Sequence, residues 1–313
     1  MAINAESPKK WKKDIAASVD LFNGWFMKFA PKAYRDTRIT TTKEVEAALK
    51  LTNDLRAITP EVLRRSPGVL STLRMSTCPP LARDRLVGLA YVNKNLVKIM
   101  EAGKAPTRMA EKEVKENLER ITDIIGRMLD VDIFPWLGKK SGPDDGQRHR
   151  ASTIVADRLC GSVSDPIIRN AQERRQLAYI AEYLKKKGYR EKPHPPGRPI
   201  QEMEAGTFCF RLSVPTKRVN IPIDCVIQPK KRRPDGLPIL IEAKSAGDFT
   251  NVNKRRKEEA TKVNQLRELY GDDVAFILFL CGYFDIGYLG YEAAEGIDWV
   301  WEHRIQDMKK LGL

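Results

Sequence analysis

The chain has 313 residues, 42% of them hydrophobic and 31% charged, which is the composition of a globular protein large enough for two domains. It has no apolar run near the roughly 20 residues that span a bilayer, no signal-peptide core and no CxxC pair among its five cysteines, which excludes membrane-spanning, secreted and zinc-site classes and predicts a cytoplasmic protein. The net charge of +14 is positive in both halves and favours a polyanion partner, nucleic acid or an acidic membrane surface, with a solvated basic surface as the alternative.

The first part of the chain, residues 1–137, carries helical periodicity. Apolar residues recur with the spacing of one helix face from Trp11 to Phe26, and again within residues 81–100 and 110–129. We therefore expect a helical N-terminal domain, residues 1–138, that serves dimerisation or DNA contact. The polar stretch that follows, residues 139–150, contains Gly and Pro and is expected to be a linker.

The remaining residues, 151–313, are expected to form a second domain. Asp165 and Pro166 are typical of a helix start, because the acid can cap the first turn and Pro suits the first helical position. From there the predicted order is helix, strand, strand, strand, helix, strand. The ranges are 165–187, 207–214, 219–227, 238–244, 254–270 and 274–280, followed by a turn region at 283–290 and a last helix at 297–311.

Three charged residues lie on two strands that we expect to be adjacent. The basic segment 228–238 contains Pro and Gly and suits a reversal, so an antiparallel pair would bring Asp224 near Glu242 and Lys244. Two carboxylates this close repel unless a proton or a cation lies between them, and Mg²⁺ prefers such oxygen ligands. The lysine could orient or activate a water. A hairpin whose charges pair in solvent is the alternative, and Asp235 in the apparent turn is a rival to Asp224.

The element order and the pattern Pro222-Ile-Asp224 followed by Glu242-Ala-Lys244 resemble the catalytic core of the PD-(D/E)XK nuclease superfamily. One extra residue separates the Pro from the Asp, which departs from the usual pattern. The resemblance implies an α/β fold with a mixed central sheet flanked by helices. It also implies Mg²⁺ held by the two carboxylates, a water oriented by the lysine, and products with a 5′-phosphate and a 3′-hydroxyl. Supporting side chains from the first and second helices are implied as well: Glu173, with Glu182 as an alternative, and Gln265. An ordinary acid on the helix surface is the other interpretation of either glutamate.

A closer resemblance spans nearly the whole chain. Residues 25–38, 74–90, 155–173 and 240–266 are similar to the XamI family of type II restriction endonucleases. The resemblance implies a bacterial enzyme that cuts double-stranded DNA with Mg²⁺, and a cognate DNA methyltransferase that acts on the same site without needing to bind the enzyme. The family's substrate is a short palindrome, GTCGAC in its founding member, and that sequence is expected here. A palindromic site also predicts a homodimer, since a two-fold protein mirrors a two-fold site.

Two basic clusters near the predicted catalytic residues are candidates for contact with DNA phosphates. A solvated charge run is the alternative for both. Other functions left open by the sequence are a repair or junction nuclease on the same fold and a non-catalytic DNA-binding protein. The clusters are Lys230, Arg232 and Arg233 in the turn, and Lys254, Arg255, Arg256 and Lys257 at the start of a helix.

Overall fold

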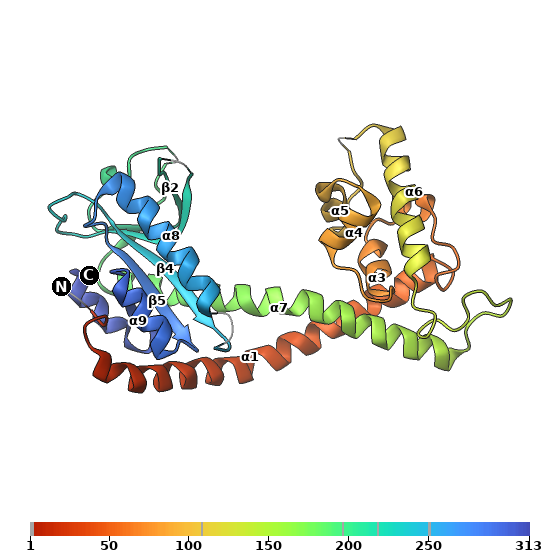
Figure 1. Ribbon diagram of the computed structural model, residues 1–313, viewed down its shortest axis with the longest axis horizontal. Helices are drawn as coiled ribbons and strands as arrows, with labels where there is room; N and C mark the ends of the chain where they lie inside the picture. Colours follow the sequence, from red (N-terminus) through yellow and green to blue (C-terminus); the bar gives the residue numbers. More distant parts are fainter. Residues whose placement is uncertain (1–2, 108, 196, 218, 250–251) are drawn as a thin grey trace. The chain divides into compact units, whose positions relative to one another are not determined.

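The computed structural model describes residues 3–107, 109–195, 197–217, 219–249 and 252–313, and for residues 252–256 the backbone alone. It comprises two compact units (Figure 1). The sheet unit consists of Met1–Phe29 and Arg169–Leu313, and the helical unit consists of Ala30–Ile168. Within the described ranges, no helix is long and apolar enough to cross a lipid bilayer.

Two long helices, α1 (Pro8–Leu51) and α7 (Asp145–Lys186), contribute residues to both units. Each contains a proline close to the unit boundary, Pro31 in α1 and Pro166 in α7. Proline lacks the backbone N–H that a helix interior uses, so each helix loses one hydrogen bond there. The unit boundaries therefore fall close to a missing backbone hydrogen bond in each helix.

The start of α7 corrects the prediction of a helix beginning at Asp165. The helix begins at Asp145, twenty residues earlier by sequence number, and includes residues 145–150 of the expected linker. Ala151, Val155 and Leu159 are buried at helical spacing in the core of the helical unit. Burial of that face continues the helix through Pro166, since it outweighs the cost of one missing hydrogen bond.

The helical unit is built from short helices around one apolar core, as the periodicity of the first part of the chain predicted. The predicted helix at 81–100 is instead two helices, because Tyr91 adopts a left-handed conformation and ends the first of them. Buried residues from most of these helices form the core, among them Leu63, Leu73, Leu96 and Ile121. The short helices are α2 (Pro60–Arg65), α3 (Val69–Met75), α4 (Arg83–Ala90), α5 (Lys94–Glu101) and α6 (Glu111–Met128).

The sheet unit contains a six-stranded mixed sheet whose spatial order follows the chain order. The first two strands are parallel, the next two pairs antiparallel, and the last two pairs parallel. Both β4 and β5 lie inside the sheet. β5 is buried throughout and β4 is buried at 239–242, which explains the apolar runs at 276–281 and 239–241. The strands are β1 (Arg190–Glu191), β2 (Thr207–Val214), β3 (Ile221–Gln228), β4 (Ile239–Ala246), β5 (Phe276–Gly282) and β6 (Asp298–Trp301), with a 3₁₀ turn η1 (Ile200–Glu202) before β2.

Helices cover both faces of this sheet (Figure 1). On one face, α8 (Val252–Tyr270), α9 (Ile286–Ala294) and the start of α1 pack through residues such as Trp11, Leu266 and Leu289. On the other face, the last turns of α7 and the 3₁₀ helix η2 (Glu302–Leu311) pack through residues such as Ile180 and Met308. The predicted order of helix, three strands, helix and strand is confirmed as α7, β2, β3, β4, α8 and β5.

Two predictions near the C-terminus were wrong. The expected turn region contains α9, whose first turn is capped by the Asp285 carboxylate accepting from Tyr288 N at 2.6 Å. The expected last helix begins instead with strand β6. Trp299 and Trp301 point to one face of the sheet and Val300 points to the other. This alternation places an apolar side chain in the core on each face of the sheet.

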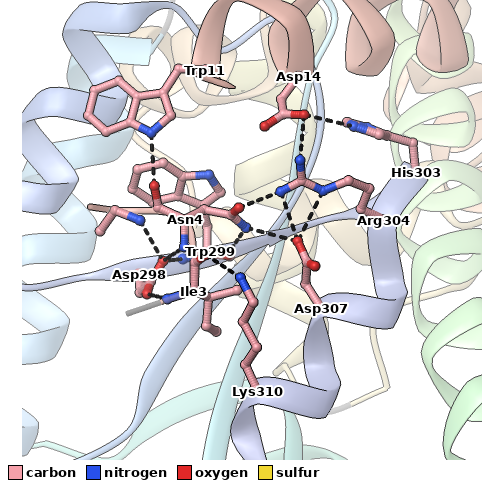
Figure 2. A network of polar contacts seen from close by, with 11 residues as sticks. Ile3, Asn4, Trp11, Asp14, Asp298, Trp299, His303, Arg304, Asp307 and Lys310 are labelled. Atoms are coloured by element: carbon pink, nitrogen blue, oxygen red, sulfur yellow. Dashed lines mark hydrogen bonds and ion pairs between the residues drawn. The ribbon is translucent and has the colours of Figure 1, made fainter. Parts of the chain in front are cut away.

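The segment at the start of the chain belongs to the sheet unit through a polar network (Figure 2). Asn4 Nδ2 donates to Trp299 O at 2.9 Å, and the Asp298 carboxylate accepts from Asn4 N at 2.9 Å. Arg304 Nη1 lies 2.7 Å from Asp14 Oδ1, which ties α1 to η2. These contacts join residues almost 300 positions apart, so the compact units differ from the expected domains 1–138 and 151–313.

Candidate active site

The site lies where β3 and β4 separate. Their ladder ends at the pair Cys225–Ile241, so the backbone N–H of Ala243 lies beyond it. Asp224 Oδ2 accepts from that N–H at 2.8 Å and takes the place of a strand carbonyl. The carboxylate of Asp224 is thereby fixed beside Glu242, the residue across from it on β4.

Glu242 is the buried centre of the site, with 4% of the residue exposed. Its Oε1 accepts from Lys244 Nζ at 2.9 Å and also from Lys262 Nζ on α8. Its Oε2 is buried and has no hydrogen-bond partner among the described residues. The structure therefore brings together the three residues singled out in the sequence and adds a second lysine.

A further carboxylate, that of Glu259, lies close to Lys244. Glu259 on α8 is 1% exposed, and its Oε2 accepts from Tyr288 Oη at 2.6 Å. Its Oε1 is 3.7 Å from Lys244 Nζ. Sequence reasoning missed both Glu259 and Lys262. A signal existed, because Glu259 shares a helix face with Val263 and Leu266, and an acid on an apolar face requires a partner.

The charges in the site perturb one another. Burial, followed by the charge of Glu242, raises the pKa of Asp224 to about 6. Burial alone would lower the pKa of Lys244, but the carboxylates of Glu242 and Glu259 outweigh it, and the net pKa is raised. The ammonium of Lys244 is therefore charged at neutral pH, and the carboxylates around it bind a further cation favourably.

The donor set fits a small divalent cation. Asp224 and Glu242 supply hard oxygen ligands, and one buried oxygen of Glu242 has no partner within the described residues. No group of three or more His, Cys, Asp or Glu side chains that could hold a metal occurs in the part of the chain that the structure describes. A carboxylate pair is the protein contribution typical of Mg²⁺, which keeps waters and phosphate oxygens in its other positions.

The supporting residues suggested by the sequence differ in their placement. Glu173 on α7 is close enough for its charge to raise the pKa of Asp224, and it pairs with Arg211 at 2.8 Å. Glu182 lies on the exposed face of α7, paired with Lys186 at 2.6 Å. Gln265 is half-buried on α8, and no hydrogen bond joins it to the site among the described residues.

A glutamine on α7 that sequence reasoning missed contacts the backbone of β4, the strand that carries Glu242 and Lys244. Gln176 on α7 is 1% exposed, and its Nε2 is 3.4 Å from Lys244 O and 3.3 Å from Phe279 O. The side chain thus joins α7 to the backbone of β4 and β5 at the level of Lys244. The rival Asp235 lies apart from this cluster, in the loop after β3, where Arg233 Nη2 pairs with it at 3.0 Å.

The basic loop after β3 makes contacts within the protein. Lys230 Nζ donates to Lys187 O at 2.7 Å, and Arg232 Nη2 donates to Met203 O at 2.6 Å. Arg233 joins Asp235 to the carbonyl of Asp273. Lys257 on α8 is exposed. The side chains of the other three candidates, Lys254, Arg255 and Arg256, lie outside the described residues.

These contacts predict different roles for the two basic clusters. We expect Arg233→Ala to lower the free energy of unfolding by about 1–2 kcal/mol, because it removes charge-assisted hydrogen bonds within the protein. The salt dependence of DNA binding should be unchanged. Lys257→Ala should leave stability unaffected and reduce the slope of log affinity against log salt by about 1, as the loss of one phosphate contact does. Urea unfolding measures the change in stability, and binding titrations at several salt concentrations measure the salt slope. A reduced salt slope in Arg233→Ala together with a loss of stability in Lys257→Ala would contradict this division.

The sequence is similar to known restriction enzymes. A family described as XamI restriction endonuclease matches residues 53–301, a range that contains Asp224, Glu242 and Lys244. The chain is 54% identical over 313 residues to the Type II restriction enzyme SalI of Streptomyces albus G, covering 99% of both chains. It is 24% identical over 194 residues to the Type II restriction enzyme XamI of Xanthomonas campestris pv. amaranthicola, covering 62% of this chain and 64% of the relative. No solved structure matches. The chain therefore belongs to the XamI family of type II restriction endonucleases, which are site-specific deoxyribonucleases.

Proposed function

We propose that this enzyme cuts both strands of double-stranded DNA at a short palindrome, using Mg²⁺ and a PD-(D/E)XK core in the sheet unit. One observation carries the proposal. Asp224 and Glu242 lie close enough where β3 and β4 separate for the charge of Glu242 to raise the pKa of Asp224, and Lys244 Nζ lies 2.9 Å from Glu242 Oε1. The mixed sheet with helices on both faces, and with the acid and lysine on a central strand, supports the same core.

The residues of the site have distinct roles in this proposal. Asp224 and Glu242 would hold the Mg²⁺ ion. When bound, the ion lowers the pKa of a water and offsets charge on the scissile phosphate. Lys244 orients the attacking water and stabilises the negative charge that develops on the phosphate, because its ammonium remains protonated between two carboxylates. In-line attack leaves a 5′-phosphate and a 3′-hydroxyl.

Recognition and assembly form the second part of the proposal. We assign GTCGAC as the recognition sequence, on the family resemblance carried by the sequence. A homodimer matches such a site, because each protomer would cut one strand of a two-fold symmetric duplex. A cognate methyltransferase would protect the same site in the host. The helical unit would serve dimerisation or DNA contact.

The test is incubation of the purified protein with unmethylated phage DNA, in Mg²⁺ and in EDTA. We expect discrete bands in Mg²⁺ only, with fragment ends mapping to GTCGAC. A synthetic duplex that contains GTCGAC should be cut, and a duplex with the two central bases exchanged should remain intact. A smear would indicate a repair or junction nuclease, and a gel shift without cleavage would indicate a DNA-binding protein. Bands that map to another sequence would reject the assigned site but retain the endonuclease.

A further inference from the structure

One carboxylate oxygen in the site accepts hydrogen bonds from two lysines. Glu242 Oε1 accepts from Lys244 Nζ on β4 and from Lys262 Nζ on α8. Two ammonium groups near one buried oxygen repel each other, and a divalent cation bound to the same carboxylate would repel both. Both ammonium groups therefore oppose binding of a metal at Glu242, even though Oε2 has no hydrogen-bond partner among the described residues, and the metal binds more favourably if one ammonium moves away.

The two lysines differ in what else holds them. Lys244 pairs with two carboxylates, because its Nζ is 2.9 Å from Glu242 Oε1 and 3.7 Å from Glu259 Oε1. Glu259 is in turn fixed by the hydroxyl of Tyr288. Lys262 has Glu242 as its acidic partner, and no second carboxylate pairs with it among the described residues. Its side chain is 26% exposed, so it can turn outward into water at little cost.

We propose that Lys262 is a resident cation, which neutralises Glu242 until a divalent metal takes its place, and that Glu259 keeps Lys244 in position during the exchange. This inference rests on the proposed function, because it presumes that Glu242 is a metal ligand. Before the exchange, Lys262 satisfies a buried carboxylate that would otherwise be costly. After it, the released ammonium can pair with a phosphate oxygen of the DNA backbone, while Lys244 stays beside the reacting group.

The exchange has a consequence for metal affinity in the absence of DNA. In this proposal the metal displaces Lys262, so the positive charge of that lysine weakens metal binding to the wild-type protein. Removing that charge should tighten metal binding by about tenfold, the scale expected for one unit charge a few ångströms away in a partly buried site. Glu259→Gln should act in the opposite direction, because Lys244 then has Glu242 as its remaining strong partner and competes harder with the metal.

The experiment is a titration of the full-length, DNA-free protein with Mn²⁺, in which the free ion is measured by electron paramagnetic resonance. Lys262→Met keeps the aliphatic stem and removes the charge, whereas the matched control Lys262→Arg keeps the charge. We expect Lys262→Met to bind Mn²⁺ about tenfold more tightly than wild type and Lys262→Arg to remain within about twofold of it. Glu259→Gln should bind more weakly than wild type.

The outcomes separate this inference from the proposed function. If wild type binds Mn²⁺ and Lys262→Met binds it no more tightly, the exchange is rejected and the metal site stands. If neither protein binds Mn²⁺, both ideas are rejected. A second measurement uses the wild-type protein alone, so it does not depend on the folding of any variant. In a wild-type crystal soaked with Mn²⁺, Lys262 Nζ should move away from Glu242 while Lys244 Nζ remains near Glu259. A metal on Glu242 with Lys262 still bound there would overturn the proposal.

Discussion

Asp224→Asn is expected to abolish cleavage and to make the protein more stable at neutral pH. Cleavage should fall by about 10³-fold or more, the scale on which single groups that stabilise a transition state act. Stability should rise because the ionised carboxylate is held in an unfavourable place, with burial and the charge of Glu242 raising its pKa from 3.8 to about 6. Asn can still accept the hydrogen bond from Ala243 N.

The sign of the stability change follows from the direction of the pKa shift. A carboxyl whose pKa is raised by folding binds its proton more tightly in the folded state, so its contribution favours folding below the ordinary pKa of 3.8 and is lost as pH rises through about 6. Above that pH the ionised Asp224 opposes folding. Asp224→Asn should therefore increase the free energy of unfolding by about 1–3 kcal/mol at pH 8, and the gain should disappear near pH 4.

Urea unfolding at both pH values and single-turnover cleavage measure the two effects. The matched control is Asp235→Asn, which removes the rival aspartate in the loop after β3. Asp235 accepts from Leu237 N at 2.9 Å and pairs with Arg233, so its replacement should slightly lower stability and leave cleavage intact. Loss of cleavage in Asp235→Asn with retention in Asp224→Asn would reverse the assignment of the metal ligand.

The core of the site could be predicted because its residues are close in sequence and lie on strands with unambiguous patterns. Asp224 and Glu242 are joined by one short loop, and the buried run at Ile239–Ile241 permits little besides a central strand. Once the two strands pair, the alternation of side chains decides which residues share a face. The proximity of Asp224, Glu242 and Lys244 can therefore be predicted from this short stretch of sequence alone.

The remaining features depended on contacts distant in sequence. β6 is short, and its identity is decided by parallel pairing with β5, which the periodicity of residues 297–311 does not reveal. Residues 11–26 are helical as predicted, but the fold decides that Trp11 packs against Trp299 and that Asp14 pairs with Arg304. Lys262 looks like an ordinary surface lysine in the sequence, and its pairing with Glu242 depends on α8 packing beside β4 in the fold.

Lys244→Met is expected to lose cleavage and, unlike Asp224→Asn, to lose stability. Removing the ammonium leaves Glu259, 1% exposed, without its nearest cation and leaves Glu242 with Lys262 alone. Breaking a buried pair in this way costs about 3–5 kcal/mol, and the remaining lysine should reduce the loss to roughly 2–4 kcal/mol. Cleavage should fall by about 10³-fold or more, because the group that we propose to orient the water and stabilise the phosphate charge is absent.

The double variant Lys244→Met/Glu259→Gln identifies the cause of that loss. If the isolated charge of Glu259 is responsible, neutralising it should restore much of the stability while cleavage remains absent, a coupling that a double-mutant cycle measures directly. Lys186→Met is the matched control, since its exposed pair with Glu182 one helical turn away contributes about 0.5 kcal/mol or less. Wild-type stability in Lys244→Met would show that the buried pair contributes nothing. The expected result is a gain of stability in Asp224→Asn and a loss in Lys244→Met, although both variants lose cleavage. These opposite changes would show that the site holds excess negative charge at Asp224, which Lys244 offsets only in part.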